Sequence, residues 1–258
     1  MLFDLKSGKR RRVIQVIFGL LAFVFFISFV GFGIGSDVSG GIFDAIGIGN
    51  DSSGSSQYED QIEDAEETLE TTPGDEQAML DLVRYNFLAA TEEGIEQNPQ
   101  TGAVEISEES RAGLEATVAA WDDYLATDPR NPDSGAASNA AQAFQLLGDF
   151  DGAAQAQRII AEDSKSAAQY ATLAQYLYAD GQLKAGDEAG QQAVRFADAS
   201  QREQFRKSMD NLAELARDFQ KQLEKAQKKG GSQDEAAAGL ENPFGGLSGG
   251  TGTPAPAP

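Results

Sequence analysis

The chain has 258 residues, no histidine and no cysteine, and 41 acidic residues against 20 lysines and arginines, which gives a formal net charge of −21. The two missing residue types exclude disulfides, thiolate metal sites, cysteine nucleophiles and every catalytic arrangement built on an imidazole. The strong acidity argues against nucleic acid as a partner, because its phosphates would be repelled.

The chain begins with a basic segment, residues 1–12, and an apolar run follows it directly. Residues 13–34 contain no charged side chain. A helix of that length spans roughly 33 Å, close to the hydrocarbon thickness of a bilayer. The basic residues next to the run are Lys9, Arg10, Arg11 and Arg12. Because such residues stay in the cytoplasm, we predict a single-pass protein of the cell membrane with a cytoplasmic N-terminus, a transmembrane signal anchor over 13–34 and an extracytoplasmic remainder.

Cleavage of this anchor is left open by the sequence. A cleavable signal peptide has an apolar region of about 7–15 residues, which favours the uncleaved anchor, although the small residues after the run would permit cleavage. Gly31, Gly33 and Gly35 leave the outer end of the anchor narrow enough to pack closely against another transmembrane helix.

Three regions follow the anchor. Residues 35–56 are rich in Gly and Ser and predict a flexible tether. Residues 57–229 show helical periodicity and no sustained alternation with a period of two, so they predict a helical domain. Residues 230–258 have little apolar content and predict a disordered tail, whose Pro/Ala end is either a spacer, which we favour, or a ligand for another domain.

The helical domain divides at its turn and cap signals. Pro73-Gly74 and the Asp-Pro sequence at 128–129 end helices, Asp75 is a candidate N-cap, and a polar insertion occupies about 94–106. The predicted helices before the repeats are 57–71, 76–93 and 107–127. Four more helices fit between 133 and 198.

The last predicted helix, 200–229, begins at a candidate capping box of Ser200 and Glu203. Its apolar residues alternate in steps of four and three: Phe205, Met209, Leu212, Ala216, Phe219 and Leu223. We favour a helix that caps the domain. A coiled coil that joins two copies of the chain is the alternative.

Two tight turns, at Gly148 and Gly181, lie 33 residues apart, and each joins two helices. An apolar residue follows each glycine, and small residues recur in the second helix. This pattern resembles the tetratricopeptide repeat, which packs two antiparallel helices in about 34 residues. The positions that match the motif are Gly148, Phe150, Ala153, Tyr170, Gly181, Leu183 and Ala193.

The match is degenerate, because in the first repeat the large early position is Ala137 and the closing proline is replaced by Lys165. The resemblance implies an all-α fold: one transmembrane helix, then a tetratricopeptide-like α-solenoid of about three helix pairs with a long C-terminal capping helix. An irregular helical bundle is the alternative.

The sequence holds no residue pattern that indicates catalysis. Paired acids such as Glu92-Glu93 point in different directions on a helix and do not converge. The segment from Asp149 to Gly152 lacks the later ligands of a calcium loop, so the turn of the repeat explains it better. Trp121 lies on an apolar helix face and predicts core packing. We therefore expect no enzyme, no cofactor and no metal site.

A tethered solenoid is suited to binding an extended or helical segment of another protein, and its anchor raises the effective concentration of that surface for membrane partners. The layout of basic end, signal anchor and exported repeat domain resembles YfgM-type ancillary subunits of the Sec translocon, and the anchor resembles those of PpiD-type periplasmic chaperones. The resemblance implies an accessory or chaperone for secretion, with the translocon or exported chains as partners. The alternative is a structural scaffold of a cell-wall or division complex.

Overall fold

A computed structural model of the protein describes residues 54–92, 94–97 and 104–227. The predicted cytoplasmic segment, the anchor, most of the tether and the tail lie outside these residues, together with the basic residues 9–12 and the anchor glycines 31, 33 and 35. Within the described residues, no helix is both long and apolar enough to cross a membrane.

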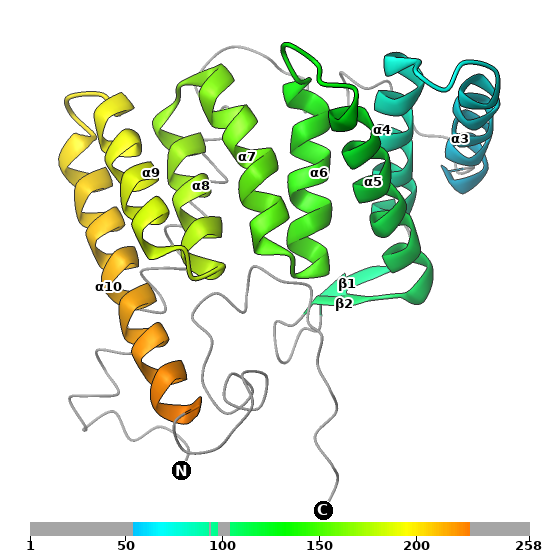
Figure 1. The fold of residues 1–258 in the computed structure, drawn as a ribbon. Helices are drawn as coiled ribbons and strands as arrows, with labels where there is room; N and C mark the ends of the chain where they lie inside the picture. Colours follow the sequence, from blue (N-terminus) through cyan, green and yellow to red (C-terminus); the bar gives the residue numbers. More distant parts are fainter. Residues whose placement is uncertain (1–53, 93, 98–103, 228–258) are drawn as a thin grey trace, which may run out of the picture. The chain divides into compact units, whose positions relative to one another are not determined.

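The described part of the chain is all-α apart from one short two-stranded ribbon, which confirms the predicted fold class at that level. Figure 1 shows the helices side by side in chain order, each packed against the next. The helices are α3 (Gly54–Thr71), α4 (Glu76–Glu92), α5 (Glu108–Ala126), α6 (Ser134–Leu147), α7 (Phe150–Ser164), α8 (Ala167–Ala179), α9 (Leu183–Phe196) and α10 (Arg202–Gln227).

The helices from α4 onward form three pairs, α4 with α5, α6 with α7 and α8 with α9. We call α4, α6 and α8 the first helices and α5, α7 and α9 the second helices. The first helix α4 also packs on α6, and α8 packs in a similar way on α10. The last helix, α10, therefore stands where the first helix of a fourth pair would stand.

Side chains cap most of the helices at their N-termini. In each case an Asp or Ser side chain accepts a hydrogen bond from the backbone N–H three residues later, which satisfies a donor that the helix leaves unpaired and is worth about 1 kcal/mol. The capping residues are Asp75, Ser107, Asp133, Asp149 and Ser166. The predicted cap at Asp75 is confirmed by its 2.9 Å bond from Ala78 N–H.

The turn glycines that the sequence singled out have left-handed backbones. Gly148 closes α6 and Gly181 follows α8, both with φ of 83°. A Cβ at Gly181 would also lie 2.6 Å from the Gln220 amide of α10. These turns let each pair reverse within two or three residues.

Replacing Gly181 with alanine should destabilise the domain by about 1–2 kcal/mol, because an L-residue pays that cost in a left-handed conformation. Gly74→Ala is the matched control, since a Cβ there meets nothing within 4 Å and the backbone φ is not positive. We expect the control to be neutral or slightly stabilising. Urea unfolding followed by circular dichroism measures both, and equal midpoints for the two variants would contradict this account of the turn.

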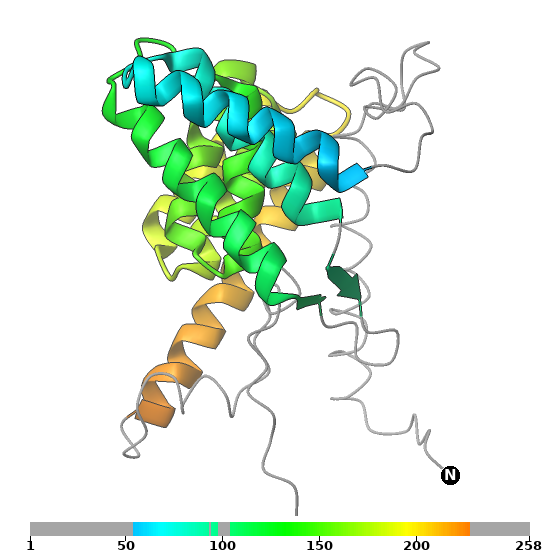
Figure 2. The same cartoon turned by 90° about the vertical axis from the view of Figure 1, so that its right-hand side faces the viewer.

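The insertion between α4 and α5 differs from its prediction as a purely polar interruption. Strand β1 (Ile95–Gln97) pairs antiparallel with β2 (Val104–Ile106), with Ile95 opposite Ile106. The ribbon lies at one end of α4 and α5 (Figures 1 and 2). Ile106 packs against the core cluster of Phe87, Leu114 and their neighbours, so the ribbon closes the end of that pair.

Two helix boundaries also differ from prediction. α3 begins at Gly54, inside the stretch assigned to the tether. α10 begins at Arg202 and not at Ser200, because residues 198–201 form a turn in which Asp198 accepts from the backbone N–H of Gln201. The predicted capping box is not formed, and Glu203 instead pairs with Arg206 and Lys207.

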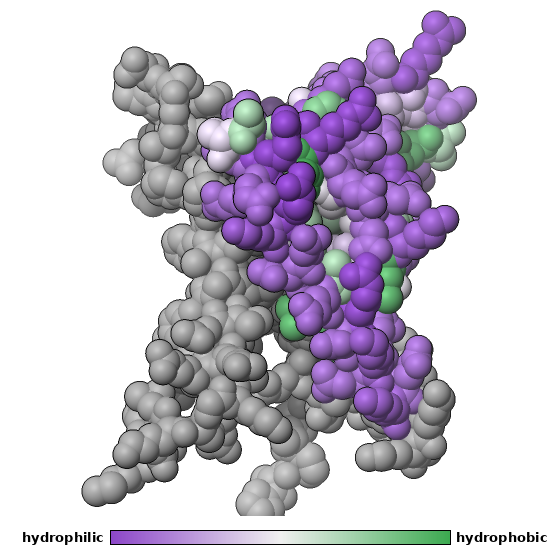
Figure 3. Space-filling view, turned by 90° about the vertical axis from the view of Figure 1, so that its left-hand side faces the viewer, coloured by the Kyte–Doolittle hydropathy of each residue, from purple (hydrophilic) through white to green (hydrophobic). Residues whose placement is uncertain are grey.

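The alternating apolar stripe of α10 is buried within the single chain. All six of its residues are less than 9% exposed, with Ala216 at 1%. The helix packs against α9 and α8 and runs past the end of α9 (Figures 1 and 2). Figure 3 looks onto this end of the row and shows a mainly hydrophilic surface over the described residues. This burial favours packing inside one chain over a coiled coil between two.

Candidate protein-binding surface

The repeat positions singled out in the sequence lie at the contacts within and between helix pairs. Ala153 and Ala193 are fully buried on the second helices, where a larger side chain would separate the helices. Phe150 and Leu183 are the half-buried first residues of α7 and α9. Tyr170, at the start of α8, stacks on Phe196 with ring centroids 5.2 Å apart.

Within two pairs, a glycine of the second helix lies directly against an aromatic ring of the first helix. A Cβ at Gly152 would lie 2.4 Å from the Phe144 ring, and one at Gly186 would lie 2.6 Å from the Tyr178 ring. The sequence pattern did not single out Gly152 or either of the two partner rings. Phe144 and Tyr178 are 34 residues apart, the length of one repeat, and this spacing could have indicated that the two rings occupy equivalent positions.

Polar contacts link one pair to the next. The Tyr176 hydroxyl on α8 donates to the Gln145 side-chain oxygen on α6 at 2.5 Å. The buried Gln157 amide on α7 donates to the Gln169 side chain on α8 at 2.7 Å. These bonds fix the register between neighbouring pairs and so fix the surface that the first helices present.

The first helices α6 and α8 contain no charged residue, whereas every other helix of the described part carries several. On α6 the incompletely buried positions include Ser138, Gln142 and Gln145, one helical turn apart. On α8 they include Ala168 and Thr172. The bond between Tyr176 and Gln145 brings the two stripes together. We call these five residues, 138, 142, 145, 168 and 172, the uncharged face.

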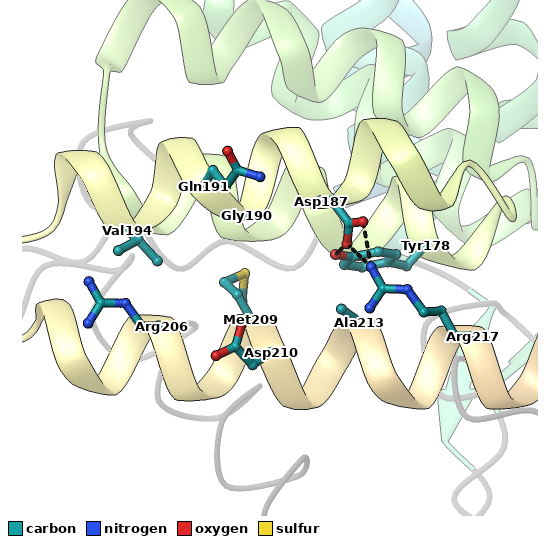
Figure 4. Close-up of a pocket in the computed structure, with 10 residues that line it drawn as sticks. All are labelled: Tyr178, Asp187, Gly190, Gln191, Val194, Arg206, Met209, Asp210, Ala213 and Arg217. Atoms are coloured by element: carbon teal, nitrogen blue, oxygen red, sulfur yellow. Dashed lines mark hydrogen bonds and ion pairs between the residues drawn. The ribbon is translucent and has the colours of Figure 1, made fainter.

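An open groove of about 560 Å³ lies between α9 and α10, with Tyr178 of α8 beneath it (Figure 4). Each helix contributes one face, whose lining residues are adjacent or three to four residues apart. The lining residues are Asp187, Gly190, Gln191 and Val194 from α9, and Arg206, Met209, Asp210, Ala213 and Arg217 from α10. Because Gly190 and Ala213 have little or no side chain, they leave the space of the groove open between the two helices.

A polar triad closes one end of this groove (Figure 4). The Tyr178 hydroxyl donates to Asp187 at 2.7 Å, and Arg217 Nη2 donates to the two oxygens of the same carboxylate at 2.6 and 2.5 Å. The triad joins α8, α9 and α10, so it holds the last helix on the preceding pair.

Burial raises the pKa of Tyr176 to about 12. Burial and the bond to Asp187 also raise the pKa of Tyr178 well above the ordinary value of 10. Both phenols therefore act as neutral donors at physiological pH. Elsewhere, burial raises the pKa of the Asp122 carboxyl, with Asp123 and Asp149 adding to the shift.

These tyrosines predict a loss of stability in strong alkali. Because the pKa of each tyrosine is higher in the folded state than in the unfolded state, the folded protein keeps the phenol proton to a higher pH. The stability that these tyrosines contribute is therefore complete below pH 10 and is lost as the pH rises toward 12. We expect the unfolding midpoint to fall over that range, and to fall less steeply in Tyr176→Phe, which cannot titrate there. Denaturation at stepped pH, with tyrosinate absorbance as the second readout, measures this. Equal pH dependence of wild type and variant would contradict it.

Among residues 54–92, 94–97 and 104–227, no group of three or more acidic side chains is placed to hold a metal ion. No family model, no curated protein and no solved structure matches the chain. Within the described residues we take the uncharged face and the α9–α10 groove as candidate sites.

Proposed function

We propose that the protein is a membrane-anchored extracytoplasmic module that binds protein segments and assists exported chains at the translocon. The observation that carries the proposal is the uncharged face: in a chain of net charge −21, helices α6 and α8 carry no charged side chain, and the five residues of the face present amides, hydroxyls and a methyl group.

The proposal rests on a tetratricopeptide-like repeat. Support comes from the three antiparallel pairs, the left-handed turn glycines and the packing of α4 on α6 and of α8 on α10. In this reading α10 is the cap, because its apolar stripe is buried and its outer side is hydrophilic. A cap is needed where a repeat array ends, since each repeat buries its apolar face only against a neighbour.

The chemistry of the uncharged face suits chains that have not yet folded. Gln142 is exposed and its amide both donates and accepts, so it can pair with an extended backbone whatever the side chains of that segment. The second helices carry charges of both signs, which solvate the opposite side. Weak, sequence-tolerant contacts of this kind fit an accessory that handles many exported proteins and performs no catalysis.

A structural scaffold of an envelope complex is the second candidate. The polar bonds between pairs, such as that from Tyr176 to Gln145, favour it because they make the stack rigid. A scaffold predicts a fixed set of partners, whereas an export accessory predicts exported chains in transit.

Site-specific photo-crosslinking in membranes separates these candidates. A photoreactive residue at Gln142 should capture exported chains or translocon subunits, and one at Gln155, exposed on α7, should capture far less. A stoichiometric set of envelope proteins at Gln142, without exported chains, would favour the scaffold. Equal capture from both positions, or capture of none of these proteins, would contradict the proposal.

A further inference from the structure

Negative charge is concentrated at one end of the helical domain. Residues 54–128, which include α3, α4 and α5, contain 20 acidic residues and two arginines. Residues 129–227, which include α6 to α10, contain 14 acidic residues and 11 lysines and arginines. The seven acids of α3 form no ion pair within the described part of the chain. The end of the domain that α3, α4 and α5 form is therefore strongly acidic.

An open groove of about 440 Å³ lies at this acidic end. Its floor is α4, which packs on both α3 and α5, and its walls are the last turns of α3 and α5. Figure 2 shows α3 and α5 spreading apart from the end where both helices finish. We call it the α3–α5 groove, and its lining is mainly apolar: Leu69, Pro73, Met79, Leu82, Ala120, Asp123, Ala126 and Thr127.

The α9–α10 groove differs from the α3–α5 groove because its charges are paired inside the chain. Arg217 pairs there with Asp187, and Arg206 pairs with Glu203. In the α3–α5 groove, Asp123 has no ion pair with any described residue. Burial raises the pKa of the neighbouring Asp122, and the negative charges of Asp123 and Asp149 add to the shift. The edge of the α3–α5 groove is thus acidic and uncompensated within the described residues.

We propose that the α3–α5 groove binds a basic amphipathic helix of a partner protein, with large apolar side chains toward the groove and lysines or arginines beside them. Charge decides between the occupants. A second copy of this chain, with its net charge of −21, would bring negative charge to an acidic edge, and so would an anionic lipid surface. A basic segment is attracted to that edge. This site lies outside the uncharged face and does not depend on the proposed function.

The dimensions of the α3–α5 groove fit two apolar side chains of a bound helix. The lining residues of α5 and its end run from Ala120 to Thr127, about 10 Å at 1.5 Å per residue. That length matches about two helical turns, and side chains three or four residues apart share one face of a helix. Leu69 and Leu82 are only partly buried, so they leave apolar surface for these side chains to cover.

Photo-crosslinking with synthetic peptides tests the proposal on the full-length protein in detergent. The probe is a helical peptide with lysines on one face and leucines on the other, one of them photoreactive, and peptide mass spectrometry locates the links. We expect links within residues 69–82 and 120–127. A peptide with glutamates in place of the lysines, and one with serines in place of the other leucines, should each give at least about tenfold less link, because each lacks one of the two attractions.

Neutral substitutions at the groove edge provide the second readout. The variant removes three exposed acids near Leu69 and on the α5 wall: Glu66→Gln, Glu70→Gln and Asp123→Asn. The control removes three exposed acids of α7 and α10: Glu162→Gln, Asp163→Asn and Glu214→Gln. Both change the net charge equally. We expect about fivefold to tenfold less link in the variant, from the loss of three exposed ion pairs, and a change within about twofold in the control.

Four results would overturn the proposal. Equal links from the lysine and glutamate peptides would show that charge does not select the occupant. Undiminished links from the serine peptide, or equal losses in the variant and the control, would show attraction to the net charge without use of the groove. Links that lie outside residues 69–82 and 120–127 would place the peptide elsewhere. Links between two copies of the chain at the groove would favour self-association instead.

Discussion

Trp121→Ala should destabilise the helical domain by about 3–5 kcal/mol, the range for removing a buried large aromatic side chain. Trp121 is 1% exposed on α5, and its ring lies 5.6 Å from that of Tyr124. Truncation would leave a cavity between α5 and its neighbours and remove this ring contact. Urea unfolding followed at 222 nm measures the loss, because the variant has no tryptophan fluorescence.

Phe196→Ala is the matched control for this prediction. Phe196 also contacts an aromatic ring, that of Tyr170, but it is 37% exposed. Its truncation should cost only about 0.5–1.5 kcal/mol, the value of an aromatic pair. Similar losses for Phe196→Ala and Trp121→Ala would mean that the centre of the domain does not lie where the structure places it.

Gly186→Ala and Gly190→Ala, four residues apart on α9, should change stability in opposite directions. A Cβ at Gly186 would lie 2.6 Å from carbons of the Tyr178 ring, whereas one at Gly190 would lie 3.4 Å from Met209, an ordinary contact. We expect Gly186→Ala to cost about 1–3 kcal/mol, since Tyr178 is buried and bonded to Asp187. We expect Gly190→Ala to gain up to about 1 kcal/mol from helix propensity.

Chemical unfolding of both variants in the same detergent measures the difference. If Gly186→Ala were as stable as Gly190→Ala, the close approach of the two helices in the pair would be wrong. The same measurement on Gly152→Ala should repeat the Gly186 result, because Gly152 meets Phe144 at 2.4 Å in the preceding pair.

Local signals were enough to predict most helices. Asp75 and the turn glycines at 148 and 181 act through their own backbone and near neighbours, and the structure bears out each of them as a cap or turn. The stripe of α10 from Phe205 to Leu223 was also readable, because strict spacing marks one buried face whatever covers it.

Features that depend on contacts far apart in the sequence were not predicted. The β1–β2 ribbon has strands of three residues, too short to show alternation, and its pairing of Ile95 with Ile106 spans the insertion. The triad of Tyr178, Asp187 and Arg217 joins three helices, and nothing in the spacing of these residues marks it. To predict the uncharged face, one would need to know how α6 and α8 are aligned with each other. The hydrogen bond from Tyr176 to Gln145 fixes that alignment, and it joins residues far apart in the sequence.

The start of α10 shows a different limit. Ser200 and Glu203 have capping-box spacing, but the turn that begins at Asp198 supplies the first acceptor, and the helix starts at Arg202. The turn at residues 198–201 therefore takes the place of the capping box that the sequence predicts.

Charges placed on the uncharged face test the proposed function most directly. The variant Ser138→Glu, Gln142→Glu and Thr172→Glu puts three carboxylates there, and the control Ala119→Glu, Gln155→Glu and Gln222→Glu puts three on exposed positions of α5, α7 and α10. Each tagged full-length protein is purified from detergent-solubilised membranes, and its partners are identified by mass spectrometry. We predict that translocon subunits and exported chains accompany the wild type and the control but not the first variant. An unchanged set of partners on the first variant, or a wild type that brings neither class of partner, would contradict the account.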